Sequence, residues 1–576
     1  MRIQIIKVYL LLLCSSLLIS CNNPPTEITI GCDVQELITA INTANNTAGN
    51  YHIHLAPGCT YSFTSKDNSN GGHGANALPL ITSTIFIEGH QARLERSQSA
   101  SQQFRLFFIS TNGNLRLDDL SIANFYSIGI PDEIDRGGGA IYNDGDLLTV
   151  NAVIFEGNHN VANGGAIFNK GTLIIRNNSV FNGNNANIGG ALYNTNITNI
   201  ATYIEDSRFE NNIAQTGGAI YNTGGDSDLS INTSEFTDNV AFDDGGAIYT
   251  SHGEVLIYSS TFSDNRAIHA ANPGSRGGAI FCGDCTLSLQ QSTFKLNRAD
   301  GEGGAIYNHD GDLRSIQKTT FDNNLSDRDG AGLYNLSGTF TMKEVSFVFN
   351  NADPFQASGG AIYNGGTGTI EKAYLAANVA EHGGAIYNNG SMSVLNSTFS
   401  VNSAREDGGH IYNGQQFDIS FSTLAESQAY HGRAIFNAGS SLRIKSSILY
   451  NTTVHQNCTD QSGTLQALGV NLDNVGDCPG FSIVADPTLD AVKNNGGYAP
   501  TYGLLSGSPA IGATNDCTDH NGITVNQDQR NVARPQPPST GWCDLGAYEG
   551  EVIPAAPPAP PLSKNTSNQS IEHENL

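Results

Sequence analysis

Apolar and polar residues alternate in short runs along most of the chain, which is the period of a β-strand. Leu173 with Ile175 and Leu229 with Ile231 are two examples. Glycine, asparagine and aspartate separate the runs, and these residues favour tight turns. Helix-forming residues are not enriched in the middle of the chain. The pattern therefore predicts an all-β protein built from many short strands.

The alternating runs belong to a repeat that begins with Gly138-Gly139-Ala140-Ile141-Tyr142-Asn143. In each unit this hexapeptide is followed by a turn, an alternating apolar pair and a Phe-x-x-Asn element such as Phe155 to Asn158. Copies return every 24 to 32 residues until a degraded one at 432–437. The copies between them begin at Gly164, Gly189, Gly217, Gly245, Gly277, Gly303, Gly330, Gly359, Gly383 and Gly408. A fixed period of this length indicates a solenoid.

Three short strands per unit predict a right-handed, three-sided parallel β-helix, similar to the solenoid of pectin lyases. Equivalent residues of successive coils should stack at about 4.8 Å, with Ile, Leu and Phe in ladders inside. We expect Gly-Gly where a Cβ atom would block a bend, and the following Asn at a turn, bonded to neighbouring coils. Strict alternation places Tyr142 opposite Ile141, so we expect an outward aromatic stripe.

The start of the chain carries a helix signal. Asp33 to Glu36 form a capping box, and Val34, Leu37, Ile38 and Ile41 follow on one helical face. Because the end of a solenoid exposes its core and its strand edge, we expect this amphipathic helix to cap the N-terminal end.

Changes in composition divide the chain into segments. His52 and His54 fall in an irregular early strand, and we interpret them as exposed strand residues and not as ligands. The expected segments are a signal peptide (1–20), a linker (21–30), the cap helix and irregular first coils (31–137), the repeat β-helix (138–437), C-terminal coils with an end domain (438–550), and a disordered Pro-rich tail (551–576).

Residues 1–20 have the features of a signal peptide, with a positive start and an apolar run from Val8 to Ile19. The run ends in Leu18-Ile19-Ser20-Cys21, which resembles the lipobox of bacterial lipoproteins. That resemblance implies a lipid on Cys21 that attaches the protein to a membrane. Asn22 is not the aspartate that retains some lipoproteins in the inner membrane, which favours the outer membrane or cell surface. The alternative is an ordinary secretory peptide with a chance cysteine.

The other cysteines also agree with export. Apart from Cys14 and Cys21 there are eight, an even number that suits an oxidising compartment. Eight cysteines allow 105 connectivities, and proximity in the sequence is the only guide to pairing. The neighbouring pairs proposed as disulfides are Cys32 with Cys59, Cys282 with Cys285, Cys458 with Cys478, and Cys517 with Cys543.

The formal net charge of −26 argues against nucleic acid as a partner, because phosphate binding needs clustered Lys and Arg. It is compatible with weak Ca²⁺ association, and the sequence indicates no other cofactor.

The Gly-Gly-Ala-Ile and Phe-x-x-Asn motifs, in this order over residues 138–437, resemble the repeats of the polymorphic outer membrane proteins. That resemblance implies a surface-exposed β-helix, and some family members are adhesins. Those proteins end in an autotransporter barrel, whereas the alternating apolar strands of a barrel are not evident before Leu576. A lipid on Cys21 is the expected anchor instead.

The C-terminal part resembles the choice-of-anchor Q domain of bacterial surface proteins, in which Gly usually occupies the position of Asn531. The resemblance supports a surface location more than an activity. The matching residues are 494–498, 507–511, 528–531, 533–535 and 543–549.

Acidic residues recur in the turn before Gly-Gly and should form one edge of the rod. The residues are Asp243, Asp244, Asp300, Glu302, Asp329 and Asp407. The alternatives are a solvated row of turns and the carboxylates of a polysaccharide lyase or glycoside hydrolase. The nearly uniform coils and the absence of familiar catalytic motifs favour the first alternative.

The sequence therefore favours a non-catalytic, lipid-anchored surface protein that serves as an adhesin or binding scaffold for glycans or cell surfaces. The alternatives are a polysaccharide lyase or hydrolase with a pectin-lyase-like fold, and a purely structural surface protein.

Overall fold

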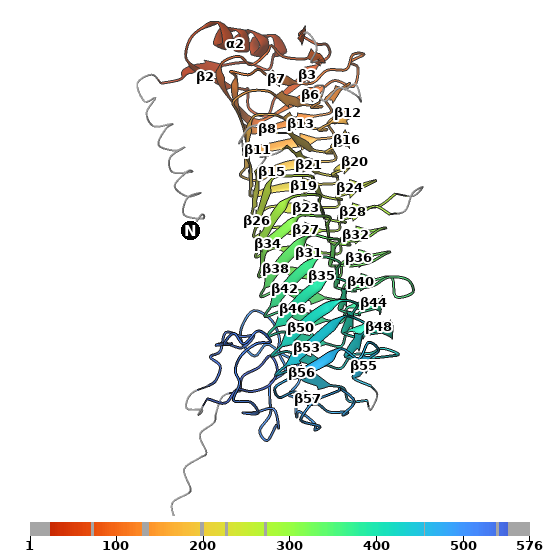
Figure 1. Cartoon of the computed structure of the whole chain (residues 1–576). Coiled ribbons are helices and arrows are strands. Elements are labelled where there is room, and N and C mark those ends of the chain that lie inside the picture. The colour runs from red at the N-terminus through yellow and green to blue at the C-terminus, as the bar shows by residue number, and fades with distance from the viewer. Residues whose placement is uncertain are drawn as a thin grey trace, which may run out of the picture.

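Stacked parallel strands make up most of the chain, with one helix at the N-terminal end (Figure 1). The computed structural model describes residues 24–70, 74–128, 137–195, 201–224, 228–269, 274–453, 456–536 and 541–550. The expected signal peptide, the lipidation site Cys21 and the Pro-rich tail lie outside the described residues. None of the helices within the described ranges is long and apolar enough to cross a membrane.

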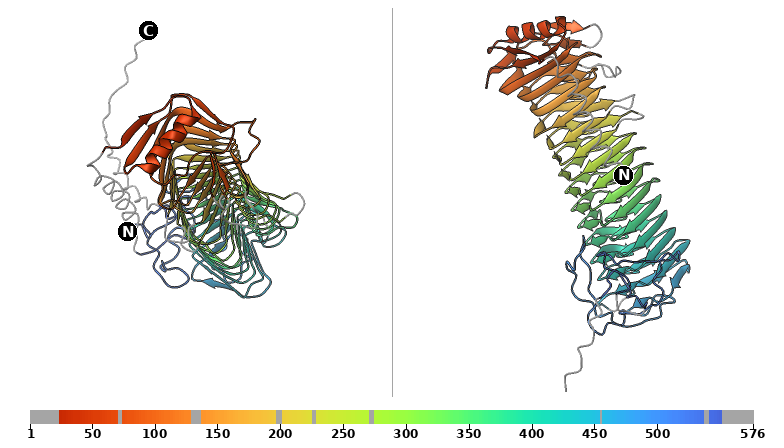
Figure 2. Two further views of the ribbon diagram at one scale, coloured as in Figure 1. Left: turned by 90° about the horizontal axis from the view of Figure 1, so that it is seen from above. Right: turned by 90° about the vertical axis from the view of Figure 1, so that its left-hand side faces the viewer.

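Equivalent residues of successive coils pair in parallel, as the repeat predicts. Ile141 pairs with Ile167, and Tyr142 pairs with Phe168. The pairing continues coil after coil, so three long sheets run the length of the rod (Figure 2). The predicted three-sided parallel β-helix is confirmed.

The first side is the tyrosine sheet, named for its outward aromatic residues. Its strands are β7 (Phe107–Ile109), β10 (Ile141–Asn143), β13 (Ile167–Asn169), β17 (Leu192–Thr195), β21 (Ile220–Thr223), β25 (Ile248–Thr250), β29 (Ile280–Cys282), β33 (Ile306–Asn308), β37 (Leu333–Asn335), β41 (Ile362–Asn364), β45 (Ile386–Asn388), β49 (Ile411–Asn413), β52 (Ile435–Asn437) and β55 (Cys458–Asp460).

The second side is the large sheet, which has two columns of strands. The columns are joined at the first coils by β1 (Thr26–Thr29), β2 (Asn50–His54), β3 (Thr60–Phe63), β6 (Thr84–Arg96), β8 (Asn114–Ala123) and β11 (Leu147–Glu156). One column contains β14 (Thr172–Arg176), β18 (Thr202–Glu205), β22 (Leu229–Asn232), β26 (Glu254–Tyr258), β30 (Thr286–Gln290), β34 (Asp312–Gln317), β38 (Thr339–Lys343), β42 (Thr367–Glu371), β46 (Ser391–Leu395), β50 (Gln416–Ser420), β53 (Ser441–Lys445) and β56 (Leu465–Leu468). The other contains β15 (Ser179–Asn182), β19 (Ser207–Glu210), β23 (Glu235–Thr237), β27 (Thr261–Ser263), β31 (Thr293–Lys295), β35 (Thr320–Asp322), β39 (Ser346–Val348), β43 (Tyr374–Ala376), β47 (Thr398–Ser400), β51 (Thr423–Ala425), β54 (Ile448–Tyr450) and β57 (Leu472–Asp473).

The strands that form the third side, the short-strand sheet, were not foreseen. Its strands are β9 (Tyr126–Ser127), β12 (His159–Asn163), β16 (Asn185–Ile188), β20 (Ile213–Ala214), β24 (Val240–Ala241), β28 (Arg266–Ala267), β32 (Arg298–Ala299), β36 (Leu325–Ser326), β40 (Asn351–Ala352), β44 (Val379–His382) and β48 (Ser403–Asp407). A regular coil therefore contains four strands and not three. The expected alternating pair and Phe strand belong to one sheet, separated by a single left-handed residue such as Thr233. A separate antiparallel hairpin joins β4 (Asn68–Asn70) and β5 (Gly74–Asn76).

The Gly-Gly pair has the predicted steric cause. Gly164 adopts a left-handed φ of 65°, which glycine tolerates best. A Cβ atom on Gly165 would lie 2.1 Å from the carbonyl oxygen of Gly190 in the next coil. In this coil the backbone can therefore turn between the short-strand and tyrosine sheets because both side chains are absent.

The interior is a set of ladders. Eight phenylalanine rings from Phe155 to Phe347 stack at centroid distances of 4.3–5.2 Å. Beside them, the Asn residues of the Phe-x-x-Asn elements from Asn158 to Asn350 are buried and donate Nδ2 to the Asn Oδ1 of the next coil, as Asn297 does to Asn324 at 3.0 Å. Because each amide also bonds backbone groups of neighbouring coils, the ladder satisfies polar atoms that water cannot reach.

The helix α2 (Val34–Asn46) caps the rod as expected (Figure 1). The Asp33 side chain accepts a hydrogen bond from the Gln35 amide at 2.7 Å. The Glu36 carboxylate accepts one from the Gly31 amide, so both acidic residues take part in capping. Leu37 and Ile41 are fully buried against the first coils.

The C-terminal region does not simply extend the rod. After β57 (Leu472–Asp473), the chain runs back along the large sheet (Figure 1). Asn531 donates to Glu344 at 2.9 Å, and Thr398 donates to Gln529 at 2.6 Å. The segment expected as an end domain therefore covers the flank of the last coils.

Candidate binding face

Stacked aromatic rings run along the outer surface of the tyrosine sheet. They lie opposite the buried isoleucines and belong to apolar clusters separate from the main core, so they point outward as predicted. Successive ring centroids are 4.6–5.2 Å apart. We call this row the aromatic stripe; it consists of Phe108, Tyr142, Phe168, Tyr193, Tyr221, Tyr249, Phe281, Tyr307, Tyr334, Tyr363, Tyr387, Tyr412 and Phe436.

Most of the aromatic stripe is buried by its own stacking. The ring faces cover one another, so a ligand can reach only ring edges and hydroxyl groups. Partly exposed residues occur in two windows. The first window consists of Tyr221 and Tyr249, and the second consists of Tyr363, Tyr387 and Tyr412. Burial raises the pKa of Tyr249 to about 12, and the phenol therefore remains a hydrogen-bond donor at neutral pH.

A hollow of about 510 Å³ opens at the first window. It is lined by Tyr221, Tyr249, Asp243, Asp244 and Arg276, among others. The predicted acidic edge and the aromatic stripe therefore meet in one concave surface, a relationship that the repeat alone did not reveal.

At this hollow, the Asp244 carboxylate forms an ion pair with Arg276. Its carboxylate accepts Arg276 Nε at 3.1 Å and Nη2 at 2.7 Å. The Arg276 guanidinium also lies 5.0 Å from the Phe281 ring centroid and 4.9 Å from that of Tyr307. Arg276 therefore covers part of the aromatic stripe and neutralises Asp244, whereas Asp243 is exposed.

Asp300 has a structural role. Its carboxylate accepts backbone hydrogen bonds from His269 at 2.7 Å, Gly274 at 3.1 Å and Ser275 at 2.7 Å. A carboxylate with three amide donors is held in place as a loop staple. This arrangement favours the solvated-turn interpretation for this member of the acidic edge.

Asp329 is the most perturbed member of the acidic edge. Burial raises the pKa of this carboxyl to about 6, and the negative charge of Glu302 contributes in the same direction. Asp329 accepts the Ser358 amide at 2.6 Å, and Glu302 forms an ion pair of 3.3 Å with Arg328. The Glu302 carboxylate thus lies close enough to raise the pKa of Asp329.

Asp407 lies at the second window. Its carboxylate is 3.2 Å from His382 Nδ1 and 2.9 Å from His431 Nδ1. The His382 ring centroid is 5.7 Å from that of Tyr412. The acidic edge therefore follows the aromatic stripe but does not converge on one catalytic centre: its members have separate partners along the rod.

All four expected cysteine pairs are disulfide-bonded in the structure. These are Cys32–Cys59, Cys282–Cys285, Cys458–Cys478 and Cys517–Cys543. Cys282 occupies the position that Asn holds in most hexapeptides, and its pairing with Asn308 in the next coil marks a break in that asparagine row. The Cys282–Cys285 disulfide, between residues three positions apart, therefore closes within one coil.

Two early residues differ from expectation. His52 and His54 were expected to be exposed, but their side chains are only 15% and 26% exposed. Both contact Glu27 from the neighbouring strand. Their alternation on one strand was visible in the sequence, whereas the pairing that brings Glu27 beside them was not.

Arginine and acidic residues of the C-terminal region form a buried polar cluster. Arg530 binds Asp528 at 2.6 Å and lies 3.6 Å from the Tyr548 ring centroid. Arg534 donates to the backbone carbonyls of Asp544 and Gly546. These residues hold the C-terminal region together beside the large sheet. A second hollow, of about 540 Å³, is lined by residues of both, among them Glu344 and Tyr498.

Comparison with solved structures finds tailspike protein 3 of bacteriophage CBA120, at 10% identity and a TM-score of 0.29. The match covers 78% of this chain and 59% of the tailspike chain. Curated protein sequences give no match.

Four segments of the chain match the Chlamydia polymorphic membrane protein repeat, at residues 206–223, 233–251, 259–283 and 291–309. Each segment runs from a Phe-x-x-Asn element to the end of the following hexapeptide. The motif order that the sequence indicated is therefore the order of this repeat. The β-helix carries polymorphic membrane protein repeats, and this combination fits a surface protein.

Proposed function

We propose that this protein is a lipid-anchored, non-catalytic surface scaffold that binds glycan chains along the aromatic stripe. One observation carries the proposal: the stripe has two partly exposed tyrosine windows, each bordered by acidic residues. The lipobox resemblance at Cys21 supports the anchor, and the polymorphic membrane protein repeats support a surface location.

The stripe suits a periodic ligand. Within each window, hydroxyl groups at the ring edges recur with each coil, and neighbouring ring centroids are 4.6–5.2 Å apart. A polysaccharide presents its own hydroxyls at regular intervals, so one chain can form the same hydrogen bond several times. Several weak contacts to one polysaccharide chain then give a higher overall affinity, because the first contact raises the effective concentration of the chain at the next tyrosine.

The negative charge of the protein restricts the kind of glycan that can bind. The chain has a formal charge of −26, and acidic side chains border both windows. A polyanionic glycan would meet like charge without a bridging cation. The proposed ligand is therefore a neutral or cationic polysaccharide.

A soluble Cys21→Ser form can be tested against neutral, cationic and anionic polysaccharides by biolayer interferometry. The Tyr363→Phe, Tyr387→Phe, Tyr412→Phe triple variant removes the hydroxyls of three partly exposed tyrosines but retains the ring stack. We expect it to weaken binding by about 10-fold or more, since each lost hydrogen bond is worth about 0.5–1.5 kcal/mol.

The matched control changes three buried tyrosines of the same stripe, Tyr193→Phe, Tyr307→Phe and Tyr334→Phe. It should bind as the parent protein does. Equal behaviour of the two triple variants, or no binding to any glycan, would contradict the proposal. Membrane fractionation tests the anchor separately, because Cys21→Ser should release the protein from the membrane fraction.

A second candidate function is glycoside hydrolysis at Glu302 and Asp329. Its support is the raised pKa of Asp329, about 6, beside a second carboxyl group. One protonated and one ionised carboxyl group form the usual acid–base pair of such enzymes. Release of reducing ends by the parent protein, lost in Asp329→Asn, would favour this function. Formation of unsaturated uronate products would instead indicate a lyase.

A further inference from the structure

Five metal-ligating side chains gather on the outer surface of the first coils. They come from three neighbouring parallel strands, β1 (Thr26–Thr29), β2 (Asn50–His54) and β6 (Thr84–Arg96). Strand register places Glu27 beside His52, and His54 beside Glu88. The remaining member, His90, follows Glu88 by two residues. This cluster lies far along the rod from the second window and plays no part in the proposed glycan binding.

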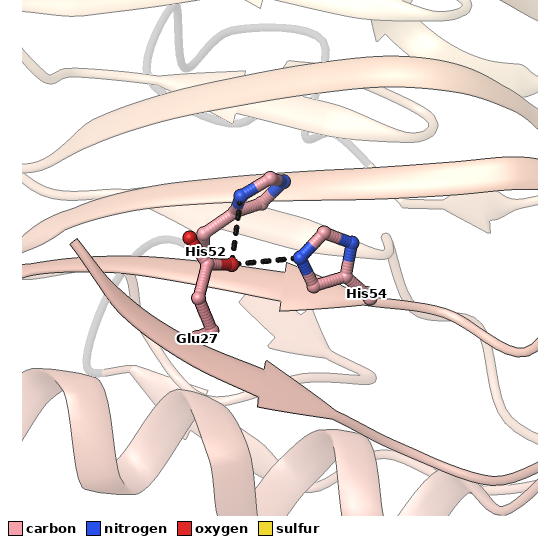
Figure 3. A group of neighbouring side chains, drawn as sticks. All are labelled: Glu27, His52 and His54. Atoms are coloured by element: carbon pink, nitrogen blue, oxygen red, sulfur yellow. Dashed lines mark hydrogen bonds and ion pairs between the residues drawn. The ribbon is translucent and has the colours of Figure 1, made fainter. Parts of the chain in front are cut away.

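Glu27 sets the orientation of two rings. One carboxylate oxygen, Oε2, accepts from His52 Nδ1 at 3.0 Å and from His54 Nε2 at 2.7 Å (Figure 3). In the neutral rings, the protons reside on these two nitrogens, and His52 Nε2 and His54 Nδ1 carry lone pairs.

Both lone-pair nitrogens lie near another carboxylate oxygen. His52 Nε2 and His54 Nδ1 are each 3.2 Å from Glu88 Oε2. His52 Nε2 is buried and has no hydrogen bond of acceptable geometry. A nitrogen lone pair this close to a carboxylate oxygen is repulsive, and a cation bound here would relieve that repulsion.

His90 completes the cluster. Its Nε2 atom is 3.3 Å from His54 Nδ1 and 3.9 Å from Glu88 Oε2. The backbone that carries it is firmly held: His90 has a left-handed φ of 48°, and its carbonyl accepts the Gly58 amide at 2.9 Å. The ring is therefore presented by a fixed corner and not by a loose loop.

We propose that this cluster is a Zn²⁺ site with His54 Nδ1, His90 Nε2 and Glu88 Oε2 as its protein ligands. Zinc–ligand bonds of about 2.0–2.1 Å place tetrahedral donor atoms about 3.3–3.4 Å apart. The distances among these three donor atoms, 3.2, 3.3 and 3.9 Å, agree with this spacing and need only small side-chain shifts. Two imidazoles and one carboxylate are the protein ligand set of zinc sites that keep a fourth position open.

Glu27 then acts in the second coordination sphere. It accepts the non-coordinating N–H group of His54, as carboxylates commonly do behind zinc-bound histidines, and it also contacts His52. Arg116 is the cation near this site, and its guanidinium is engaged by Asp118 at 2.8 and 2.5 Å. It therefore does not repel a metal ion with its full charge.

Metal binding at this site would stabilise the attachment of β1, the outermost strand of the rod. The β1 strand pairs with β2 and is largely exposed, which makes it an open sheet edge. A metal bound by β2 and β6, with Glu27 of β1 behind it, links all three strands. Zinc binding would therefore raise the stability of the N-terminal coils.

The test uses the purified full chain after chelation and dialysis. Isothermal titration with ZnCl₂ should show one strong site per chain, and Co²⁺ should give the visible absorption of a tetrahedral centre. His90→Asn keeps a residue that tolerates the left-handed corner, and Glu88→Gln keeps the shape of the carboxylate. Each should weaken zinc binding by at least about 10-fold, and Glu27→Gln by about 10–100-fold.

His252→Gln removes an exposed histidine elsewhere and should leave zinc binding unchanged. Circular dichroism melting in chelator should be the same for all variants, and added Zn²⁺ should raise the first melting transition of the parent but not of His90→Asn. Absence of stoichiometric uptake by the parent would overturn the site. Parent-like affinity in both His90→Asn and Glu88→Gln would also overturn it.

Discussion

Arg534 and Glu549 form an ion pair of 3.2 Å from which water is excluded, with both side chains almost completely buried. The Arg534 guanidinium also lies 4.3 Å from the ring centroid of Phe421, at a corner of the large sheet. It donates in addition to the Asp544 and Gly546 carbonyls. One arginine thus joins the C-terminal region to itself and to the β-helix.

Arg534→Met should detach or loosen the C-terminal region. The change leaves the Glu549 carboxylate buried without its cation, at a cost of about 3–5 kcal/mol. Hydrogen exchange of residues 484–536 and 541–550 should accelerate, while the repeat coils stay protected. The double variant Arg534→Met, Glu549→Gln should recover part of the loss, because it removes the unpaired charge.

Lys493→Met is the control for this prediction. Its ion pair with Asp490 is exposed, so its loss should cost less than about 1 kcal/mol. An Arg534→Met protein that exchanges as slowly as this control would show that the buried pair does not hold the region.

Asn297→Ala should destabilise the rod by about 2–5 kcal/mol. Asn297 is fully buried, donates to Asn324 and Phe262, and accepts from Asn265. The truncation leaves buried groups of two neighbouring coils without a partner, at about 1–3 kcal/mol for each unsatisfied group. Denaturant unfolding followed by circular dichroism measures the effect.

Asn351→Ala is the matched change at an exposed position, in β40 (Asn351–Ala352) of the short-strand sheet. It should shift the unfolding midpoint little. Similar midpoints for Asn297→Ala and Asn351→Ala would mean that the asparagine ladder contributes no specific stability.

The repeat carried enough information to predict the coil. Ile141 alternates with Tyr142, and the structure places them on opposite sides of the sheet because a strand has period two. The strand β24 (Val240–Ala241) escaped prediction because two residues show no period. The bend at Thr233 between two strands of the large sheet was not predicted, because a single non-glycine residue in the left-handed conformation has no sequence signature.

Contacts between distant segments could not be predicted. Asn531 reaches Glu344 across 187 positions, and His54 reaches His90 across 36. Such contacts depend on how many residues each coil contains and on where the chain reverses. The acidic edge was predicted as a row, but the raised pKa of Asp329 arises from burial by neighbouring coils.

Cys32→Ser with Cys59→Ser should loosen the N-terminal cap. The disulfide joins residues 27 positions apart, next to α2 (Val34–Asn46). Closing a loop of this length restricts the unfolded chain and stabilises the fold by about 3.5 kcal/mol. Limited proteolysis near the helix should therefore become faster.

Cys282→Ser with Cys285→Ser provides the comparison, since that loop spans three positions. The same relation gives about 2 kcal/mol, and the change is confined to one coil. Cleavage near α2 should stay at the parent rate in this variant. Equal cleavage in both double variants would contradict a local role for Cys32 and Cys59.

Asp329 should make the rod less stable as pH rises from about 4 to 6. Its pKa is about 6 in the folded protein, above the ordinary value of about 3.9 for an unfolded chain. The folded state therefore binds more protons in this window, and the free energy of unfolding falls as pH increases. Asp329→Asn removes the titration, so it should match the parent at pH 4 and exceed it by about 2 kcal/mol at pH 7.5. Thermal melting across this range, with Asp327→Asn as the exposed control, measures the slope. If the parent and Asp329→Asn share the same pH dependence, the Asp329 carboxyl is ionised in the folded state, and the case for it as a general acid in hydrolysis also fails.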